Sequence, residues 1–539
     1  MMNEYPNEKR PIGRILKNKA EVNQDKVFFY FENKAFSYQK TNKMANKWAN
    51  GYQSLGIKKG DKVTAMMPNS PEFLFHWFGL AKLGGVDNPI NTAYKGDLLR
   101  HVISLSGSKV ILIYEDFLER IELIQDELPE LEKIILYAPS GNKPETDLKI
   151  PIIPCEDILK DDSEPTPDEE VRHCDPLQII YTSGTTGPSK GVLLPHNAMY
   201  YYGADSVKIF KLTSDDIHYS CLPMFHINIR FFTILPSLLC DTSFAMAPKF
   251  SGSRFWEDIC KFNATSFCLL GAMCDFLWNQ PPSDYEKENP ARLFFGGPLS
   301  INRAREYEER YGLKVYAGYF GMSEANWISS IDGDEADKLK TQGRWDQALS
   351  MGRENKDLYE VKLVDDFDDE VPDGELGEIT CRPARPYSMM LEYINMPEKT
   401  QEAWRNLWFH TGDVSRKDKD GYFYFVDRKK DYLRRRGENI SSFEVEAVIN
   451  TYPKTAEAVV LGIQSEEFND EDILVVLRLK PGEELDPQEL LEWCKERMAK
   501  FMVPQFVMLV DEIPRTATGR AEKYKIRKMV KMDDLVALE

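Results

Sequence analysis

The sequence lacks the patterns of a protein held together by disulfides or structural zinc. It has nine cysteines, an odd number, with no Cys-x-x-Cys pair, and its seven histidines show no metal-ligand spacing. Such scattered cysteines argue against a disulfide framework and against a zinc site. The first ten residues also lack the apolar core that a signal peptide carries. We therefore expect a protein of the reducing cytoplasm.

The sequence also lacks a basic domain and a long apolar segment, and these two absences argue against binding to nucleic acid and against a transmembrane segment. The formal net charge is −19 and no stretch forms the basic domain that a nucleic-acid-binding protein usually has. The longest apolar-leaning stretch, Phe73–Leu83, is interrupted by His76 and Lys82 and is too short to span a bilayer. We expect no nucleic acid and no transmembrane segment. The expected partners are small molecules, and a homodimer is left open.

Alternating strand-like and helix-like segments indicate an α/β fold over most of the chain. A chain of this length exceeds a single core, so about two to four domains are expected. The pattern predicts an amphipathic helix over 38–55, a strand over 62–67 and an exposed connection over 138–170. A boundary near Asp427 precedes a compact pattern that has the typical size of a small domain.

The segment Tyr181–Gly191 carries the strongest indication of chemistry. It contains three glycines, five Ser or Thr hydroxyls and one lysine. Glycines let the backbone approach a ligand closely, amides and hydroxyls donate to phosphate oxygens, and Lys190 adds a positive charge. The spacing is not that of a Walker A loop. The alternative is a flexible polar loop, but the apolar-leaning run at 177–180 favours a strand that leads into a phosphate-binding loop.

Five later motifs accompany this loop. They are Tyr319–Glu324, Trp408–Asp413, Asp427–Asp431, Arg436–Ile440 and Pro514–Arg520. By the order and spacing of these motifs, the chain from Phe36 to Lys528 resembles the adenylate-forming superfamily of acyl-CoA synthetases, non-ribosomal adenylation domains and beetle-type luciferases. Four segments narrow the resemblance: Gly184–Val192, Leu269–Met273, Phe294–Leu299 and Arg435–Ser441. Through them the chain is most similar, within that superfamily, to acyl-CoA synthetases of the crotonobetaine/carnitine-CoA ligase group.

The resemblance implies a large N-terminal adenylate-forming domain over 1–427, made of two α/β subdomains and a β-rich subdomain. A hinge over 428–431 and a small, mobile α+β C-terminal domain over 432–539 would follow. In the implied reaction, ATP converts a carboxylic acid to an acyl-adenylate and releases pyrophosphate. A thiol, usually that of coenzyme A, then displaces AMP. The first step brings a carboxylate against a negatively charged phosphate, so it needs cations, and Mg²⁺ is one of them.

The resemblance also assigns the nucleotide site. Glu324 would ligate Mg²⁺, whereas a glutamate without this context is usually a surface carboxylate. Asp413 would accept hydrogen bonds from the ribose hydroxyls, Arg428 would donate to the ribose or a phosphate, and Ser323 would bond near the α-phosphate. The remaining predicted ATP- and AMP-binding residues are Thr182, Ser183, Gly184, Thr185, Thr186, Gly187 and Lys190 at the β- and γ-phosphates, Gly296, Gly297 and Pro298 beside adenine, and Tyr319, Phe320, Gly321 and Met322, of which Phe320 would stack on the base.

The acyl side of the site is implied by a segment around His226. This histidine would line the approach of the acyl group and the thiol, although a lone histidine is more often structural. The residues expected around the acyl pocket are Asn228, Gly271, Ala272 and Trp327. Aromatic side chains there would suit the quaternary ammonium of a carnitine-like acid or, equally, a short or medium acyl chain.

A hinge residue and a coenzyme A surface follow from the same resemblance. In the family the small domain swings between the two half-reactions, and the matching hinge residue is Lys430. The residues predicted to meet coenzyme A are Arg434, Arg435, Arg436, Gly437 and Glu438. The alternative for the three arginines is a solvated charge run, and both interpretations are kept.

Arg520 departs from the family pattern, which has the adenylation lysine at this position. Lysine is a compact charge and arginine a planar fork, so the two bridge a carboxylate and a phosphate differently. Three alternatives stay open: Arg520 serves, Lys523 substitutes from the next turn, or adenylation is slow. The leading prediction is an AMP-forming acid:CoA ligase that uses ATP, Mg²⁺ and coenzyme A. The alternatives are adenylation for a carrier-protein thiol and a nucleotide-binding homologue with weakened catalysis.

Overall fold

The chain folds into two compact units. A computed structural model describes residues 4–141, 145–182, 189–297, 299–429, 433–435, 438–464, 471–515 and 521–538. Of these residues, the larger unit comprises those of 4–182, 189–360 and 383–402, and the smaller comprises those of 361–382 and 403–538. The predicted mixed α/β fold, with a large N-terminal and a small C-terminal part, is confirmed. The boundary at 427 and the hinge over 428–431 stay predictions.

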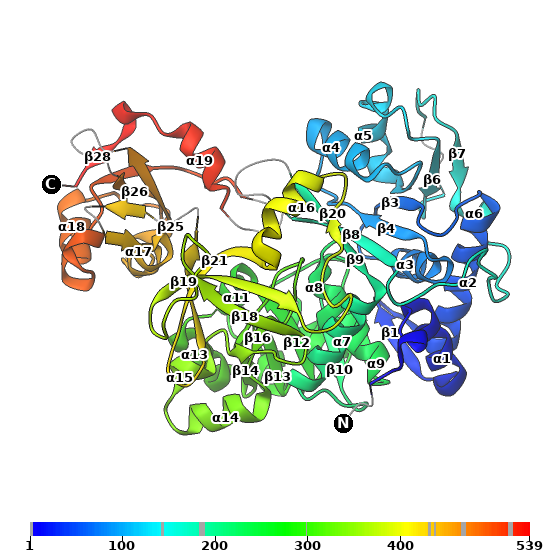
Figure 1. The fold of residues 1–539 in the computed structure, drawn as a ribbon, viewed down its shortest axis with the longest axis horizontal. Helices are drawn as coiled ribbons and strands as arrows, with labels where there is room; N and C mark the ends of the chain where they lie inside the picture. Colours follow the sequence, from blue (N-terminus) through cyan, green and yellow to red (C-terminus); the bar gives the residue numbers. More distant parts are fainter. Residues whose placement is uncertain are drawn as a thin grey trace. The chain divides into compact units, whose positions relative to one another are not determined.

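Two large sheets organise the larger unit (Figure 1). Within the described residues, one sheet has eight strands and the other has seven. The eight-stranded sheet runs β20 (Glu392–Tyr393), β9 (Lys190–Pro195), β8 (Pro176–Thr182), β4 (Val86–Pro89), β3 (Lys62–Met66), β5 (Val110–Tyr114), β6 (Lys133–Tyr137), β7 (Ile152–Pro154). The seven-stranded sheet runs β14 (Lys314–Tyr316), β13 (Leu293–Gly297), β12 (Ser266–Leu270), β10 (Ile217–Ser220), β11 (Ser243–Met246), β1 (Val27–Phe31), β2 (Lys34–Ser37). A short third sheet joins β15 (Tyr319–Phe320), β16 (Ser329–Ser330) and β17 (Arg353–Glu354).

Helices cover both sheets in layers. α3 (Pro71–Leu83) is buried on nearly every face because it contacts β4 of one sheet and, through the ring pair Phe29–Phe75, β1 of the other. α4 (Gly96–Ser106) and α5 (Leu118–Glu122) pack on the eight-stranded sheet. α10 (Phe255–Lys261), α11 (Gly271–Trp278) and α13 (Ile301–Tyr311) pack on the seven-stranded sheet.

Elements with a strong local pattern agree with the sequence. The helix predicted over 38–55 is α2 (Tyr38–Ser54), and the strand predicted over 62–67 is β3. The exposed connection predicted over 138–170 is wrong in part, because β7 extends the sheet there and α6 (Cys155–Ile158) follows it. Both elements are too short to show a period.

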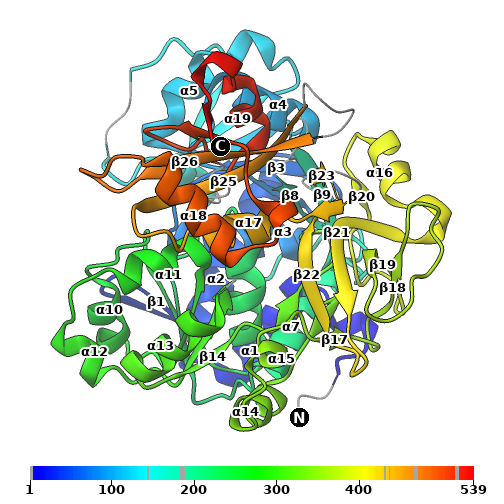
Figure 2. The same cartoon turned by 90° about the vertical axis from the view of Figure 1, so that its left-hand side faces the viewer.

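The smaller unit contains a four-stranded antiparallel sheet and an α+β part. The first sheet runs β18 (Tyr359–Val364), β19 (Leu376–Pro383), β21 (Phe409–Lys417), β22 (Phe423–Arg428). A hairpin of β23 (Leu433–Arg435) and β24 (Glu438–Ile440) comes next. The last sheet runs β25 (Thr455–Gln464), β26 (Glu471–Leu479), β27 (Phe506–Leu509), β28 (Val536–Ala537). Figure 2 shows α17 (Ser442–Ile449) and α18 (Pro487–Arg497) on one face of it and α19 (Lys523–Met529) on the other, in accord with two separate apolar clusters.

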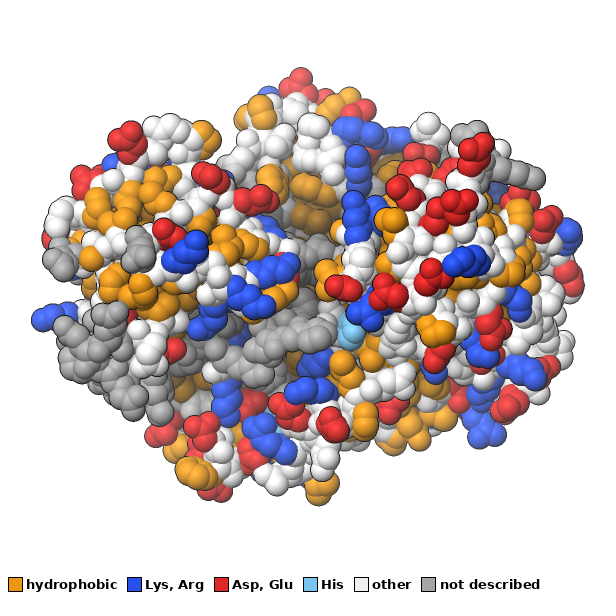
Figure 3. Space-filling model, turned by 90° about the horizontal axis from the view of Figure 1, so that it is seen from above, with side chains coloured by type: hydrophobic (Ala, Val, Ile, Leu, Met, Phe, Trp, Pro, Cys, Tyr) orange, Lys and Arg blue, Asp and Glu red, His pale blue; other side chains and the backbone are white. Residues whose placement is uncertain are grey.

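The described helices are not of the membrane-spanning kind: none of them combines the necessary length and apolar character. On the face drawn in Figure 3, acidic and basic side chains are interspersed among hydrophobic ones.

Candidate active site

The glycine-rich segment lies between two paired strands of the eight-stranded sheet. β8 ends at Thr182 and β9 begins at Lys190, and these two residues close the antiparallel register. The predicted strand that leads into the loop is therefore confirmed. The predicted phosphate-binding residues between them, Ser183, Gly184, Thr185, Thr186 and Gly187, lie outside the described residues.

Tyr393, which sequence reasoning missed, contacts both Lys190 and Glu324. Its strand β20 pairs with β9 at the edge of the sheet. The Lys190 Nζ atom lies 4.0 Å from the centroid of the Tyr393 ring. The Tyr393 hydroxyl donates to Glu324 Oε1 at 2.8 Å. The structure thus joins the predicted phosphate lysine and the predicted metal ligand through one side chain, whose only signal in the sequence is a short extended run.

Glu324 has the properties of a ligand for a hard cation. Glu324 is only 2% exposed, and its Oε2 atom has no hydrogen-bond partner among the described residues. Buried polar atoms are normally satisfied, so this oxygen fits a bound ion. No cluster of three or more metal-ligating side chains occurs in the described part of the chain. Mg²⁺ is commonly bound by one or two carboxylates together with substrate phosphates, which agrees with a single glutamate here.

The loop from Tyr319 to Trp327 is tightly wound around Gly321. A Cβ atom at Gly321 would lie 2.4 Å from Asn326 Oδ1, and Met322 N donates to Ala325 O at 2.9 Å. Trp327 ends the loop with a φ of 56°, a strained value for so bulky a residue. Such strain persists only where the surroundings enforce the conformation, and it is typical of functional sites. Phe320 and Ser323 are half-buried on this loop.

Trp327 is a core residue of the larger unit. It is fully buried, its Nε1 donates to Tyr202 O at 2.9 Å, and its ring contacts Tyr319 and Phe231. These contacts anchor the end of the 319–327 loop in the core of the larger unit. The predicted role of Trp327 in the acyl pocket stays a prediction.

The predicted adenine side begins at the ends of β12 and β13. Gly296 has a φ of 145°, and a Cβ atom there would lie 2.1 Å from Leu269 O. Only glycine fits this close approach, and Gly297 follows it with a φ of 137°. The parallel partner strand β12 continues directly into α11, whose first residues are Gly271 and Ala272. Pro298 lies outside the described residues.

A buried arginine fixes the turn that carries His226 and Asn228. Both residues are half-buried at the start of α8 (Ile227–Ile229). Arg230 Nε donates to Met224 O at 3.1 Å, and Nη1 donates to Gln178 Oε1 on β8 at 2.6 Å. One side chain therefore ties the predicted acyl segment to the strand that leads into the glycine-rich loop.

Asp87 completes this buried network. Its carboxylate lies 2.6 Å from Arg230 Nη2 and 3.0 Å from His76 Nε2, and all three side chains are fully buried. Burial acts to raise the pKa of Asp87, but Arg230 and His76 outweigh it and hold that pKa below its ordinary value. Asp87 and Arg230 thus form a buried ion pair that has a structural role.

In the smaller unit, the predicted ribose-binding residues face each other. Asp413 on β21 is opposite Arg428 on β22, and Arg428 Nε lies 2.7 Å from Asp413 Oδ1. The next residue, Lys429, lies 3.0 Å from both Glu378 Oε2 and Asp366 Oδ1. The predicted hinge residue Lys430 lies outside the described residues.

Lys523 is paired inside the smaller unit. Its Nζ atom lies 3.0 Å from Glu446 Oε1 and donates to Ser442 Oγ at 2.6 Å. Burial raises the pKa of Glu446, and Lys523 opposes that shift. The described contacts of Lys523 therefore join α19 to α17, while Arg520 lies outside the described residues.

The predicted coenzyme A residues fall on and beside one hairpin. Arg434 and Arg435 are on β23 and Glu438 is on β24, with Arg435 paired to Glu438 in the register. Arg436 and Gly437 lie outside the described residues. The choice between a coenzyme A surface and a solvated charge run stays open.

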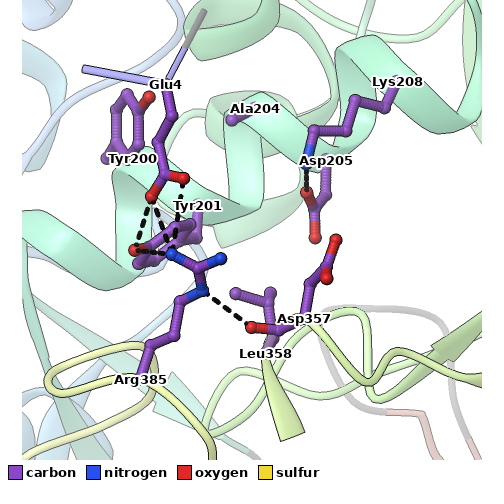
Figure 4. Close-up of a pocket in the computed structure, with 9 residues that line it drawn as sticks. All are labelled: Glu4, Tyr200, Tyr201, Ala204, Asp205, Lys208, Asp357, Leu358 and Arg385. Atoms are coloured by element: carbon purple, nitrogen blue, oxygen red, sulfur yellow. Dashed lines mark hydrogen bonds and ion pairs between the residues drawn. The ribbon is translucent and has the colours of Figure 1, made fainter.

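A depression on the larger unit is lined by both acidic and basic side chains (Figure 4). Four of its five ionised side chains form two ion pairs: Arg385 Nη1 lies 3.0 Å from Glu4 Oε1, and Lys208 Nζ lies 3.2 Å from Asp205 Oδ1. We regard it as a place where the N-terminal segment is held on α7 (His196–Ile209), because Tyr5 N donates to the Tyr200 hydroxyl at 2.8 Å and the Tyr201 hydroxyl donates to Glu4 Oε1 at 3.0 Å. Its lining residues are Glu4, Tyr200, Tyr201, Ala204, Asp205, Lys208, Asp357, Leu358 and Arg385.

Comparison with solved structures agrees with this architecture. The structure of ATP-bound MatB from Rhodopseudomonas palustris is similar with a TM-score of 0.82 and 25% identity, covering 97% of this chain and 99% of that one. The anthranilate CoA ligase AuaEII in complex with anthranoyl-AMP is similar with a TM-score of 0.83, covering 98% of each chain. At 23% identity, the second likeness shows the fold alone.

Sequence comparison is more specific. Crotonobetaine/carnitine–CoA ligases of Salmonella enteritidis and Salmonella typhimurium are each 32% identical to the chain over 524 residues, which is 94% of this chain and 97% of theirs. The family of AMP-binding enzymes matches residues 16–394, and the C-terminal domain of AMP-binding enzymes matches residues 444–520. These matches cover nearly the whole chain, and they agree with the order of its motifs and with the contacts of Tyr393 to Lys190 and Glu324. The chain belongs to the family of AMP-binding enzymes.

Proposed function

We propose that the enzyme is an AMP-forming acid:CoA ligase that activates a carboxylic acid with ATP and transfers the acyl group to coenzyme A. The observation that carries this proposal is the contact of Tyr393 with both Lys190 and Glu324. A cation and a partly unsatisfied carboxylate held together in a buried place suit the phosphates of a metal-bound nucleotide.

In the first half-reaction, the glycine-rich loop and Lys190 hold the β- and γ-phosphates, and Ser323 bonds near the α-phosphate. Glu324 binds Mg²⁺, which when bound neutralises phosphate charge as the carboxylate attacks. Gly296, Gly297 and Phe320 border the adenine. The acid oxygen attacks the α-phosphorus and pyrophosphate leaves, which gives the acyl-adenylate.

The ribose contacts and the second half-reaction use residues later in the chain. Asp413 accepts hydrogen bonds from the ribose hydroxyls. The ion pair between Arg428 and Asp413 keeps the Arg428 side chain in place. Arg520 is our choice for the adenylation cation, because the Lys523 ammonium is paired with Glu446. Lys430 acts as the hinge, and the hairpin with Arg434 and Arg435 meets coenzyme A.

For the acid, we propose a small carboxylate of the carnitine type as the first candidate. The support is the name of the relatives, crotonobetaine/carnitine–CoA ligase, at full-length coverage. A short or medium acyl chain is the second candidate, because Gly271 and Ala272 are small residues at the expected acyl pocket. We also propose that the enzyme works in the cytoplasm, with a homodimer as the assembly to test.

The test is a panel of carboxylic acids assayed for pyrophosphate release, with and without free coenzyme A. We expect AMP and an acyl-CoA thioester in equal amounts for at least one acid. Adenylate formation without thioester on free coenzyme A would favour a carrier-protein thiol as acceptor. ATP binding without pyrophosphate release for any acid would favour a nucleotide-binding homologue and overturn the proposal.

A further inference from the structure

Tyr393 is held in place by backbone hydrogen bonds on either side of it. Ile394 N donates to Gly191 O at 2.8 Å, and Leu391 N donates to Leu193 O at 2.8 Å. Met390 N donates to the backbone oxygen of Glu324, also at 2.8 Å. The segment 390–394 is therefore fixed against both the strand of Lys190 and the loop of Glu324.

Gly191 permits this close approach of β20 to β9. A Cβ atom at Gly191 would lie 2.7 Å from Ile394 Cγ2 and 3.0 Å from Ile179 Cγ2. A larger residue would push the edge strand outward. The glycine next to Lys190 thus has a second use besides loop chemistry, since it lets Tyr393 reach the site.

The two ends of the Tyr393 side chain act on different groups. The hydroxyl can only donate to an ionised carboxylate, so it occupies Glu324 Oε1 and leaves Oε2 as the oxygen for a ligand. The ring face attracts the Lys190 ammonium, which lies 4.0 Å from its centroid. Tyr393 is 3% exposed and Glu324 is 2% exposed, so little water competes with the contact between them, whereas Lys190 is half-buried.

We propose that Tyr393 is a positioning residue of the metal–nucleotide site, in which its hydroxyl orients Glu324 toward the cation and its ring orients Lys190 toward the phosphates. The proposal rests on the proposed function only in that the ligand is a metal-bound nucleotide. Outer-shell groups of this kind typically change metal affinity by about 10- to 100-fold when they are removed.

The two contacts can be separated by substitution. Tyr393→Phe keeps the ring and removes the hydroxyl, whereas Tyr393→Leu removes both. Binding of ATP is measured by calorimetry with Mg²⁺ and, separately, with a chelator and no divalent cation. Tyr393→Phe should weaken Mg²⁺–ATP binding by about 10-fold and leave metal-free ATP binding unchanged. Tyr393→Leu should weaken metal-free ATP binding as well.

A double-mutant cycle tests whether the hydroxyl acts through Glu324. In a Glu324→Gln background, Tyr393→Phe should have no further effect on Mg²⁺–ATP binding, since the group that it orients is altered. Tyr38→Phe is the matched control, because it removes another buried hydroxyl of the larger unit, bonded to Thr242 O at 2.7 Å. That control should lower the melting temperature without changing Mg²⁺–ATP affinity.

Three outcomes decide the matter. Mg²⁺ dependence in Tyr393→Phe equal to that of the wild type would overturn the proposal. An equal loss of metal-bound and metal-free binding would also overturn it, because it would mean that Tyr393 only stabilises the edge strand. If the wild type binds no ATP under either condition, the proposed function fails instead, and the two failures are thereby distinguished.

Discussion

Two buried glutamates, one in each unit, have opposite surroundings. Glu378 in the smaller unit is 4% exposed, and its carboxylate receives Gly412 N at 3.1 Å, Arg405 Nη2 at 3.0 Å and Lys429 Nζ at 3.0 Å. Glu324 in the larger unit is equally buried but has Tyr393 on one oxygen and no hydrogen-bond partner on the other among the described residues. A saturated carboxylate stabilises the fold, whereas a partly unsatisfied one has capacity for a ligand.

The electrostatics of Glu378 agree with saturation. Burial alone raises the pKa of a carboxyl, but His410 and Lys429 outweigh it and lower the pKa of Glu378 to about 2. The negative charge of Glu378 is thus balanced by cationic and hydrogen-bonding groups of the protein itself. Substitutions at Glu378 should therefore lower stability, and substitutions at Glu324 should impair ligand binding and activity.

The largest effect is expected at Glu324. Glu324→Gln should slow Mg²⁺-dependent pyrophosphate release by about 100-fold or more, because one charge of the metal site is lost. The melting temperature should stay near that of the wild type, since no saturated network is broken. Turnover like that of the wild type across a Mg²⁺ titration would remove Glu324 from the site.

The next effect separates Arg520 from Lys523. Arg520→Ala should slow adenylation by about 100-fold and leave thioester formation from supplied acyl-adenylate nearly unchanged. Arg520→Lys, which keeps a positive charge at this position, should retain adenylation. Lys523→Ala should mainly lower the melting temperature, because it leaves the half-buried carboxylate of Glu446 without its cation. Both half-reactions are measured for each variant. If Lys523→Ala abolishes adenylation and Arg520→Ala does not, our assignment of the cation is wrong.

Breaking the buried ion pair of Asp87 and Arg230 in the larger unit should lower the stability of the fold. Arg230→Met alone should cost about 3–5 kcal/mol of unfolding free energy, because the buried Asp87 carboxylate loses its guanidinium and keeps only the contact with His76. The double variant Arg230→Met with Asp87→Leu should recover much of that loss, as apolar replacements of buried pairs often do. Urea denaturation compares the three proteins. A double variant less stable than Arg230→Met would show that the charges themselves stabilise the fold.

The smallest effect is a pH dependence of the Glu378 cluster. Since its folded pKa of about 2 is below the unfolded value near 4.3, the charge stabilises the fold above pH 4.3 and this stabilisation is lost as the pH falls toward 2. Glu378→Gln should remove about 1–3 kcal/mol at neutral pH and flatten the curve of unfolding free energy between pH 5 and 2. Parallel curves for the two proteins would contradict the saturated state.

Local signals made much of the fold predictable, whereas the roles of the site residues, which came from the resemblance, stay predictions. The helix over 38–54 and the strand at 62–66 follow from periodicity and a glycine stop, and the motif residues follow from local order along the chain. β7 was missed because three residues show no period. Tyr393 was missed because its role depends on pairing an edge strand with β9, from which it is distant in sequence. The pairing of Lys523 with Glu446 could not be read from spacing either, since it needs the packing of two helices.

The position of β20 in the chain has a consequence for synthesis of the protein. β20 is the last strand of its sheet to be made, yet it pairs with β9. At roughly 5–20 residues per second, a ribosome needs on the order of ten seconds or more to pass from Lys190 to Tyr393. Throughout that interval the nascent chain presents the outer edge of β9 without its neighbour, and such an edge can pair with a wrong segment. Nucleotide cannot assist folding through Tyr393 in this period, because the site is completed only when the end of the larger unit emerges.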